Sequence, residues 1–112
     1  MSRQHLHTFQ LDLSDDDATP AVDMGDYSTA GVVIATADVD TNVGTFIVEG
    51  ANVAAGPFVE VPLEPPLDAL AGADVTLGAA VAMFPYAFLR VVFADPGASA
   101  DGTATVTIFK KS

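Results

Sequence analysis

Hydrophobic and polar residues alternate with a period of two along much of the chain. The alternation is clearest at 45–49, where Phe46 and Val48 fall on one face, and at 103–110, where threonines alternate with apolar residues. Strict alternation predicts strands with one buried face and one face in water. Helical periodicity does not persist over a useful length anywhere in the sequence.

Glycine, proline, aspartate and asparagine divide the chain at intervals of roughly 8–12 residues, a spacing typical of sandwiches and barrels of short strands. We expect strands at 5–13, 31–37, 45–49, 58–63, 74–83, 87–94 and 103–110, and a single helical turn at 67–70. No connection is long enough for the crossover that parallel strands need. The expected fold class is therefore all-β: an antiparallel β-sandwich of jelly-roll type with seven to eight strands and almost no helix.

The length of 112 residues predicts one domain. Within it, residues 1–20 are expected to form an N-terminal strand or arm followed by an acidic loop, and residues 21–112 the β-sandwich. Terminal segments are mobile unless they are held by other parts of the fold, and they can add a strand to a neighbouring sheet. We therefore expect residues 1–13 to contact another subunit or a larger shell.

The charge balance narrows the classes of partner. Fifteen Asp and Glu residues face four Lys and Arg residues, which gives a net charge of −11, while half of the residues are hydrophobic. This composition excludes a disordered acidic tail and argues against nucleic acid or an anionic membrane surface as partner. The absence of cysteine excludes disulfides and thiolate chemistry. No apolar run follows the N-terminus, so we expect synthesis in a cytoplasm without an export signal.

Two groups of residues are candidates for metal binding. His5 and His7 share one face of a strand, and with Asp12 as a third ligand they could hold a metal ion. The alternative is two ordinary histidines in an exposed terminal segment. The run 15–17, together with Asp12, offers oxygen ligands for calcium but lacks the spacing of an EF-hand, and a solvated acidic loop is the alternative. We expect no metal and no cofactor.

Catalytic motifs are missing from the sequence. No serine lies in a G-x-S-x-G context, and no glycine-rich phosphate loop is present. Glu49 and Glu60 could form a carboxylate pair of the kind that glycosidases use, but both occupy polar positions of alternating strands, which face solvent in a sandwich. The sequence therefore predicts a protein that is not an enzyme.

Arg90 is a cation within a strongly apolar strand at 88–93. Its guanidinium can bind a carboxylate of a partner in a bidentate manner. The alternative is an ion pair with one of the many acidic residues of the same chain. Lys110 and Lys111, at the end of the last strand, are expected to be solvated.

Two hairpins carry a resemblance to a known family. The segment GTFIVEGAN (44–52) followed by FVEVP (58–62), and the segment AFLRVVF (87–93) followed by GTATVTI (102–108), resemble the paired hairpins of discoidin-like, or galactose-binding-like, jelly rolls. In this compact form they are similar to small virion proteins of tailed bacteriophages, including head-decoration or cement proteins. The similarity covers residues 29–112. The chain has no tryptophan, and the loop before Phe58 lacks the polar groups that glycan-binding relatives use.

The resemblance implies a non-enzymatic structural protein of a phage virion, with a capsid decoration or cement subunit on the exterior of the shell as the leading hypothesis. The alternatives are a tail or neck accessory subunit, or a carbohydrate- or calcium-binding adhesion module. An acidic bacterial or archaeal protein without a viral link also fits the composition. The expected partners are the major capsid protein or other virion subunits, and further copies of the chain, preferably as a trimer. We expect the contacts to come from Arg3, His5, His7, Val53, Ala54, Ala55, Phe58 and Arg90.

Overall fold

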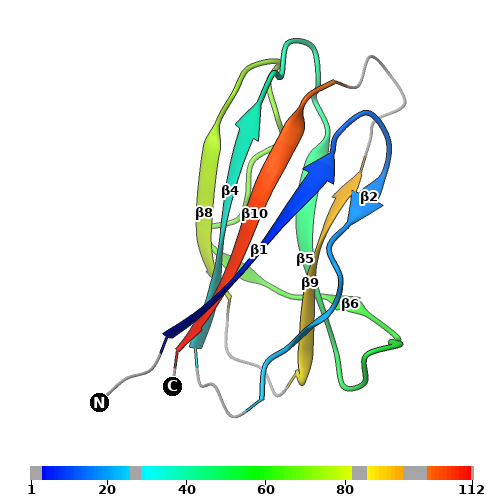
Figure 1. The fold of residues 1–112 in the computed structure, drawn as a ribbon, viewed down its shortest axis with the longest axis vertical. Helices are drawn as coiled ribbons and strands as arrows, with labels where there is room; N and C mark the ends of the chain where they lie inside the picture. The colour runs from blue at the N-terminus through cyan, green and yellow to red at the C-terminus, as the bar shows by residue number, and fades with distance from the viewer. Residues whose placement is uncertain (1–3, 26–28, 82–85, 95–100, 112) are drawn as a thin grey trace.

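The computed structural model describes residues 4–25, 29–81, 86–94 and 101–111. Two antiparallel sheets pack face to face (Figure 1). The first has the order β1 (Gln4–Asp12), β10 (Thr103–Lys111), β4 (Thr29–Ala37), β8 (Thr76–Val81) and β7 (Leu63–Glu64). The second has the order β2 (Asp17–Ala18), β9 (Phe88–Ala94), β5 (Thr45–Ala51) and β6 (Val59–Glu60), with β3 (Val22–Asp23) also paired to β9. The described residues contain no helix, and hence none long and apolar enough to span a bilayer.

The strand order is that of a jelly roll. We count β2 and β3 as one interrupted strand and leave the short β7 aside, which gives eight strands. One sheet then contains the first (β1), eighth (β10), third (β4) and sixth (β8) strands in that order. The other contains the second (β2 with β3), seventh (β9), fourth (β5) and fifth (β6). Two interleaved Greek keys produce this arrangement. The expectation of an all-β antiparallel jelly-roll sandwich is confirmed.

The core lies between the sheets and follows the alternation of the sequence. The rings of Phe46 on β5 and Phe93 on β9 have their centroids 5.1 Å apart. Inward-facing residues of β4 and β10 meet them from the opposite sheet. The most completely buried side chains are Leu13, Val32, Ile34, Val48, Val61, Val91, Phe93, Val106 and Ile108.

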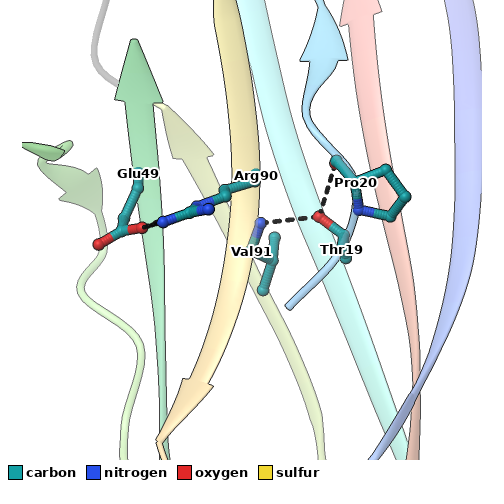
Figure 2. A network of polar contacts seen from close by, with 5 residues as sticks. All are labelled: Thr19, Pro20, Glu49, Arg90 and Val91. Carbon is teal, nitrogen blue, oxygen red and sulfur yellow. Dashed lines mark hydrogen bonds and ion pairs between the residues drawn. The ribbon is translucent and has the colours of Figure 1, made fainter. Parts of the chain in front are cut away.

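A β-bulge separates β2 from β3. Ala18 pairs with Val92 and Val22 with Leu89, so the outer strand holds one residue more than β9 between these two pairs. Thr19 fills the gap: its backbone N–H donates to the Val91 carbonyl at 2.9 Å, and its hydroxyl oxygen accepts the Val91 N–H at 3.0 Å (Figure 2). The threonine hydroxyl thus completes a ladder in which Pro20 has no N–H to donate.

Residues 58–63 do not form the single strand expected from the sequence. The pairing of Glu60 with Glu49 lies in the second sheet, whereas Leu63 pairs with Val81 in the first sheet. The chain crosses between the sheets at Pro62, which cannot donate to either ladder. Two short strands result.

The expected helical turn at 67–70 is also wrong, since this segment has no regular secondary structure. The Leu70 N–H donates to the Gly44 carbonyl at 2.9 Å, and the Leu70 side chain is buried. The segment is held by a backbone hydrogen bond to Gly44, directly before β5, and by burial of Leu70 in the core, not by bonds within a helical turn.

The N-terminal segment belongs to the first sheet. Nine successive residue pairs join β1 to β10, from Gln4 opposite Lys111 to Asp12 opposite Thr103. Leu11 and Leu13 reach the core with 2% and 0% of their surface exposed. Residues 4–13 are therefore a strand of the sandwich itself rather than an arm outside it.

Candidate docking surfaces

The outer face of the first sheet is built from the alternate residues of β1, β10, β4 and β8 that point away from the core. The pairing aligns them in rows across the sheet. We call this surface the uncharged face; it consists of Leu6, Phe109, Gly31 and Ala80 in one row, Thr8, Thr107, Val33 and Gly78 in the next, and Gln10, Thr105, Ala35 and Thr76 in the third.

Small and uncharged side chains make this surface suitable for docking. Leu6 and Val33 expose 63% and 38% of their surfaces on it. The whole chain carries a net charge of −11, so an uncharged stretch across four strands is a distinct feature of the molecule. A partner can cover it without burying an unpaired charge, and charged residues are depleted at the centres of protein interfaces.

One aromatic ring lies flat on the uncharged face. A Cβ added at Gly31 would lie 2.4 Å from Cζ of Phe109, which shows that the ring covers the backbone of the neighbouring strand. The glycine thus lets the ring lie against β4 and not project from the sheet. The uncharged face is therefore apolar and flat at this end.

The outer face of the second sheet carries an ion pair. Arg90 Nη2 on β9 lies 2.7 Å from Glu49 Oε1 on β5, and Arg90 Nε donates to the same oxygen at 2.9 Å (Figure 2). The guanidinium carbon lies 3.8 Å from the ring centroid of Phe58. The ion pair with an acidic residue of the same chain is therefore confirmed, while binding of a partner by Arg90 and Phe58 stays a prediction.

Glu49 and Glu60 stand directly opposite each other in β5 and β6. From the sequence they are candidates for a carboxylate pair of the kind that glycosidases use. In the structure Glu49 is engaged by Arg90, and 18% of its side chain is exposed. Arg90 thus compensates the negative charge that two opposed glutamates place on neighbouring strands.

The loop after β5 presents the apolar residues that the sequence analysis assigned to partner contacts. Val53 exposes 56% of its surface, and Ala54 and Ala55 are also exposed. The Gly56 N–H donates to the Val53 carbonyl at 3.0 Å and closes the turn. The structure places these side chains where a partner can reach them, and the contact itself stays a prediction.

Basic residues lie where β1 begins and β10 ends. His5 stands opposite Lys110. The Lys110 side chain is buried, and its Nζ donates to the Asp23 carbonyl. The expectation that Lys110 is solvated is wrong because it follows Ala104, Val106 and Ile108 on the inward face of β10. Arg3, another predicted contact residue, lies outside the described residues.

His7 is half-buried on the inner side of β1. Its Nε2 is buried and has no hydrogen-bond partner among the described residues. Burial, and then the neighbouring charges of Lys110 and His5, lower the pKa of His7 below its ordinary value. Among the described residues, the structure does not combine His7 with His5 and Asp12 into the metal site considered above.

A hydrogen-bonded network ties together loops at the other end of the sandwich. The Asp101 carboxylate accepts backbone N–H groups of Asp40 at 3.2 Å, Thr41 at 3.2 Å and Asn42 at 3.1 Å. Desolvation raises the pKa of Asp101, but these donors outweigh it, so the pKa lies below its ordinary value. The buried Asn42 amide donates to the Leu13 carbonyl at 2.9 Å. The network is structural, and the sequence analysis did not identify it.

The acidic loop after β1 satisfies its own backbone. The Asp12 carboxylate accepts the Ser14 N–H at 3.0 Å and the Ser14 hydroxyl at 2.7 Å, which lowers the pKa of Asp12. Asp17 in turn accepts the Asp12 N–H at 3.1 Å. Within the described ranges, no three His, Asp or Glu side chains lie close enough together to hold a metal ion.

A groove of about 270 Å³ runs beside β5, where β6 ends. Two of its lining residues are joined by a hydrogen bond, in which the Val61 N–H donates to the Val48 carbonyl at 2.8 Å. Its walls are mainly aliphatic and proline side chains, formed by Phe46, Ile47, Val48, Glu60, Val61, Pro62, Leu63, Pro66 and Leu67.

Comparisons with known proteins show similarity in fold. No protein-family model matches the chain, and no curated protein sequence matches it. The structure is similar to that of YomS, a protein derived from the SPBc2 prophage, with a TM-score of 0.61 and 13% identity over 100% of this chain and 96% of that chain. It also resembles a Bacillus endospore appendage protein of disulfide-linked pili, with a TM-score of 0.50 and 13% identity over 98% and 86%.

A third similar structure is that of infectious bursal disease virus, with a TM-score of 0.53 and 12% identity. It covers 97% of this chain but 32% of the viral chain, so the present sandwich corresponds to about a third of that protein. At these identities the similarities establish a shared sandwich fold, and function has to be argued from surfaces.

Proposed function

We propose that the chain is a non-catalytic structural subunit of a phage particle, bound to the outside of the assembled capsid as a decoration or cement subunit. The observation that carries the proposal is the uncharged face. In a protein of net charge −11, this face offers Val33 and its threonine and alanine neighbours to a partner without an electrostatic penalty. The strands that carry this face are paired along their lengths, from β1 through β10 to β4.

Such a subunit works by mass action. A protein that binds the assembled shell but not its dissociated parts stabilises the shell by RT ln(1 + [L]/Kd) per site. The acidic remainder of the surface keeps unbound copies soluble and discourages non-specific association. No reaction is needed. The fold similarity to a prophage-derived protein, over 100% of this chain and 96% of that chain, supports this setting.

The location is tested on particles induced from the organism that encodes the chain. Purified heads and tails are separated, and the chain is detected by mass spectrometry and by immunogold labelling of intact particles. We expect labelling on the exterior of heads. Labelling confined to tails or necks would assign the protein to the tail, and absence of the chain from purified particles would overturn the structural role.

The docking surface is tested with charge insertions in the recombinant chain. Val33→Glu places a carboxylate on the uncharged face, Val53→Glu places one on the loop after β5, and Val43→Glu, at a residue 48% exposed elsewhere, is the matched control. Binding to heads stripped of the protein is expected to fall at least about tenfold for Val33→Glu, which corresponds to about 1.4 kcal/mol. If Val53→Glu alone weakens binding, the loop is the docking surface.

A further inference from the structure

β1 is an edge strand without the features that usually protect an edge. The other outermost strands are β7, β6, and β2 with β3, each of two residues, and prolines at 20, 57, 62 and 65 flank them. The part of β8 that β7 does not cover, 76–79, is a shorter edge of four residues. Short strands and prolines are common ways to prevent edge pairing. β1 has nine residues, no proline, no lysine and no bulge against β10. An edge of this kind readily accepts a further strand.

The direction of the backbone groups identifies which residues are open to pairing. The Leu13 N–H donates toward β10, to the Gly102 carbonyl at 3.0 Å, so the odd-numbered residues of β1 face β10. The N–H and C=O groups of Leu6, Thr8 and Gln10 therefore point away from β10, and no described residue bonds to them. Asp12 is already capped by Asp17. The open stretch runs from Leu6 to Gln10, with Thr8 at its centre.

We propose that a second copy of this chain pairs with β1 in antiparallel orientation, about a two-fold axis at Thr8. Thr8 then stands opposite Thr8 of the second copy, and Leu6 stands opposite Gln10 of the second copy. The first sheets of the two copies join into one continuous sheet. Leu6, with 63% of its surface exposed, gains a neighbour across the junction. This interface is isologous, as two-fold homodimer interfaces are.

The charge distribution along β1 favours a second copy of this chain as the partner, and it favours antiparallel pairing of the two β1 strands. Lys111 stands opposite Gln4 at the start of the strand, whereas Asp12 and the acidic run 15–17 follow at its end. The Lys110 side chain, opposite His5, is buried and bonded to the Asp23 carbonyl, so the basic character of this end comes from Lys111. Antiparallel pairing brings the acidic end of each copy to the basic end of the other, twice in the dimer. Parallel pairing would bring like charges together. Because a two-fold axis gives a dimer, the proposed arrangement differs from the trimer expected from the sequence.

The dimer goes beyond the proposed function and is measured without any particle. It also enlarges the docking surface, because the uncharged faces of both copies lie on the same side of the joined sheet. Failure of dimerisation would leave the location experiment unaffected, and absence from particles would leave the dimer unaffected.

Single cysteines test the register, since the natural chain has none. Residues in a hydrogen-bonded antiparallel pair have Cα atoms about 5.5 Å apart, within the range of a disulfide. Thr8→Cys is therefore expected to form a covalent dimer on mild oxidation, at least about tenfold faster than Leu6→Cys, whose cysteines would be separated by roughly four residues along the strand, about 13 Å. Equal rates, or faster reaction of Leu6→Cys, would overturn the proposed register.

Association itself is measured by sedimentation velocity on the full chain. The natural chain is expected to be a dimer whose dissociation constant rises with salt, since salt screens the paired ends. Thr8→Pro removes an N–H that points away from β10, so it is expected to abolish the dimer while keeping the melting temperature of the fold. Thr8→Ala, which keeps the N–H, is the matched control and stays dimeric. A monomeric or trimeric natural chain, or a dimeric Thr8→Pro, would refute the proposal.

Discussion

Asn42 donates two hydrogen bonds to Asp101, one from its backbone and one from its side chain. The Asn42 backbone N–H donates to the Asp101 carboxylate, and the Asn42 side-chain amide donates to the Asp101 carbonyl, both at 3.1 Å. The same side chain bonds to Leu13, and its oxygen accepts the Gly44 N–H at 2.8 Å. A single buried amide thus joins the segments that follow β1 and β4 to the turn before β10.

Replacing Asn42 by alanine is expected to lower the free energy of unfolding by at least about 2 kcal/mol, because each polar group left buried without a partner costs about 1–3 kcal/mol. Chemical denaturation monitored by circular dichroism measures the change. Val43→Ala, at an exposed neighbouring position, is the control and should stay within about 0.5 kcal/mol of the natural chain. Equal effects of the two substitutions would contradict the role of the network.

The lowered pKa of Asp101 makes part of the stability dependent on pH. A carboxylate whose pKa is lower in the folded state adds stability above its unfolded pKa of about 3.9 and loses it as the pH falls through the folded value. We expect the melting temperature to decline below about pH 4 and Asp101→Asn to reduce that decline. Asp68→Asn, at an exposed carboxylate that no described residue bonds to, is the control. An unchanged acid slope in Asp101→Asn would refute this expectation.

Arg90 is expected to be coupled energetically to both Glu49 and Phe58. Double-mutant cycles with Arg90→Ala should give about 0.5–1 kcal/mol for each pair, since the guanidinium is partly exposed. Removal of Arg90 also leaves Glu49 opposed to Glu60 without a compensating cation. Glu60→Gln should therefore stabilise the Arg90→Ala variant more than the natural chain. Additive effects in chemical denaturation would show that the cluster is not coupled.

Substitution by alanine should have different effects on stability at two glycines, Gly44 and Gly78. A Cβ at Gly44 would lie 2.4 Å from Cζ of the buried Phe93 and 2.7 Å from the Ala94 carbonyl oxygen, so Gly44→Ala should cost about 1–3 kcal/mol. At Gly78 the nearest atom would be 3.8 Å away. Gly78→Ala should be neutral or stabilising by up to about 1 kcal/mol, because it restricts the unfolded chain. Thermal unfolding of the two variants measures both effects, and destabilisation by Gly78→Ala would be contrary to expectation.

Local alternation was sufficient to predict most of the fold. The strands around Phe46 and Val106 were predicted because residues on the buried face of a strand recur at every second position. The strand around Val32 was predicted from its run of β-branched residues. The jelly-roll class followed from the turn spacing. The split at Pro62 was missed because a crossing between sheets and a continuous strand both present alternating residues, and only the partners of Glu60 and Leu63 distinguish them.

The candidate docking surfaces were harder to predict from the sequence than the fold. The outward threonines of the last strand were recognised, but the uncharged face depends on β1 and β4 flanking that strand, a relation between residues far apart in sequence. Lys110 was misjudged although the inward alternation of β10 extends to it, because its bonding partner, the Asp23 carbonyl, is far away in the sequence. Asn42 carries no local signal beyond its place in a loop. The acidic run 15–17 was visible in the sequence, whereas the position of Lys111 beside the start of β1 depends on the pairing with β10.

The pairing of Gln4 with Lys111 also has a consequence for how the chain folds. The first and last strands lie side by side, so this ladder closes a loop that includes nearly the whole chain. Contacts this distant in sequence slow folding, because the entropy of loop closure is lost before the contact forms. A circular permutant that links the two ends and opens the chain at 52–55 would turn β1 and β10 into a local hairpin. It should fold faster than the natural chain into the same sandwich.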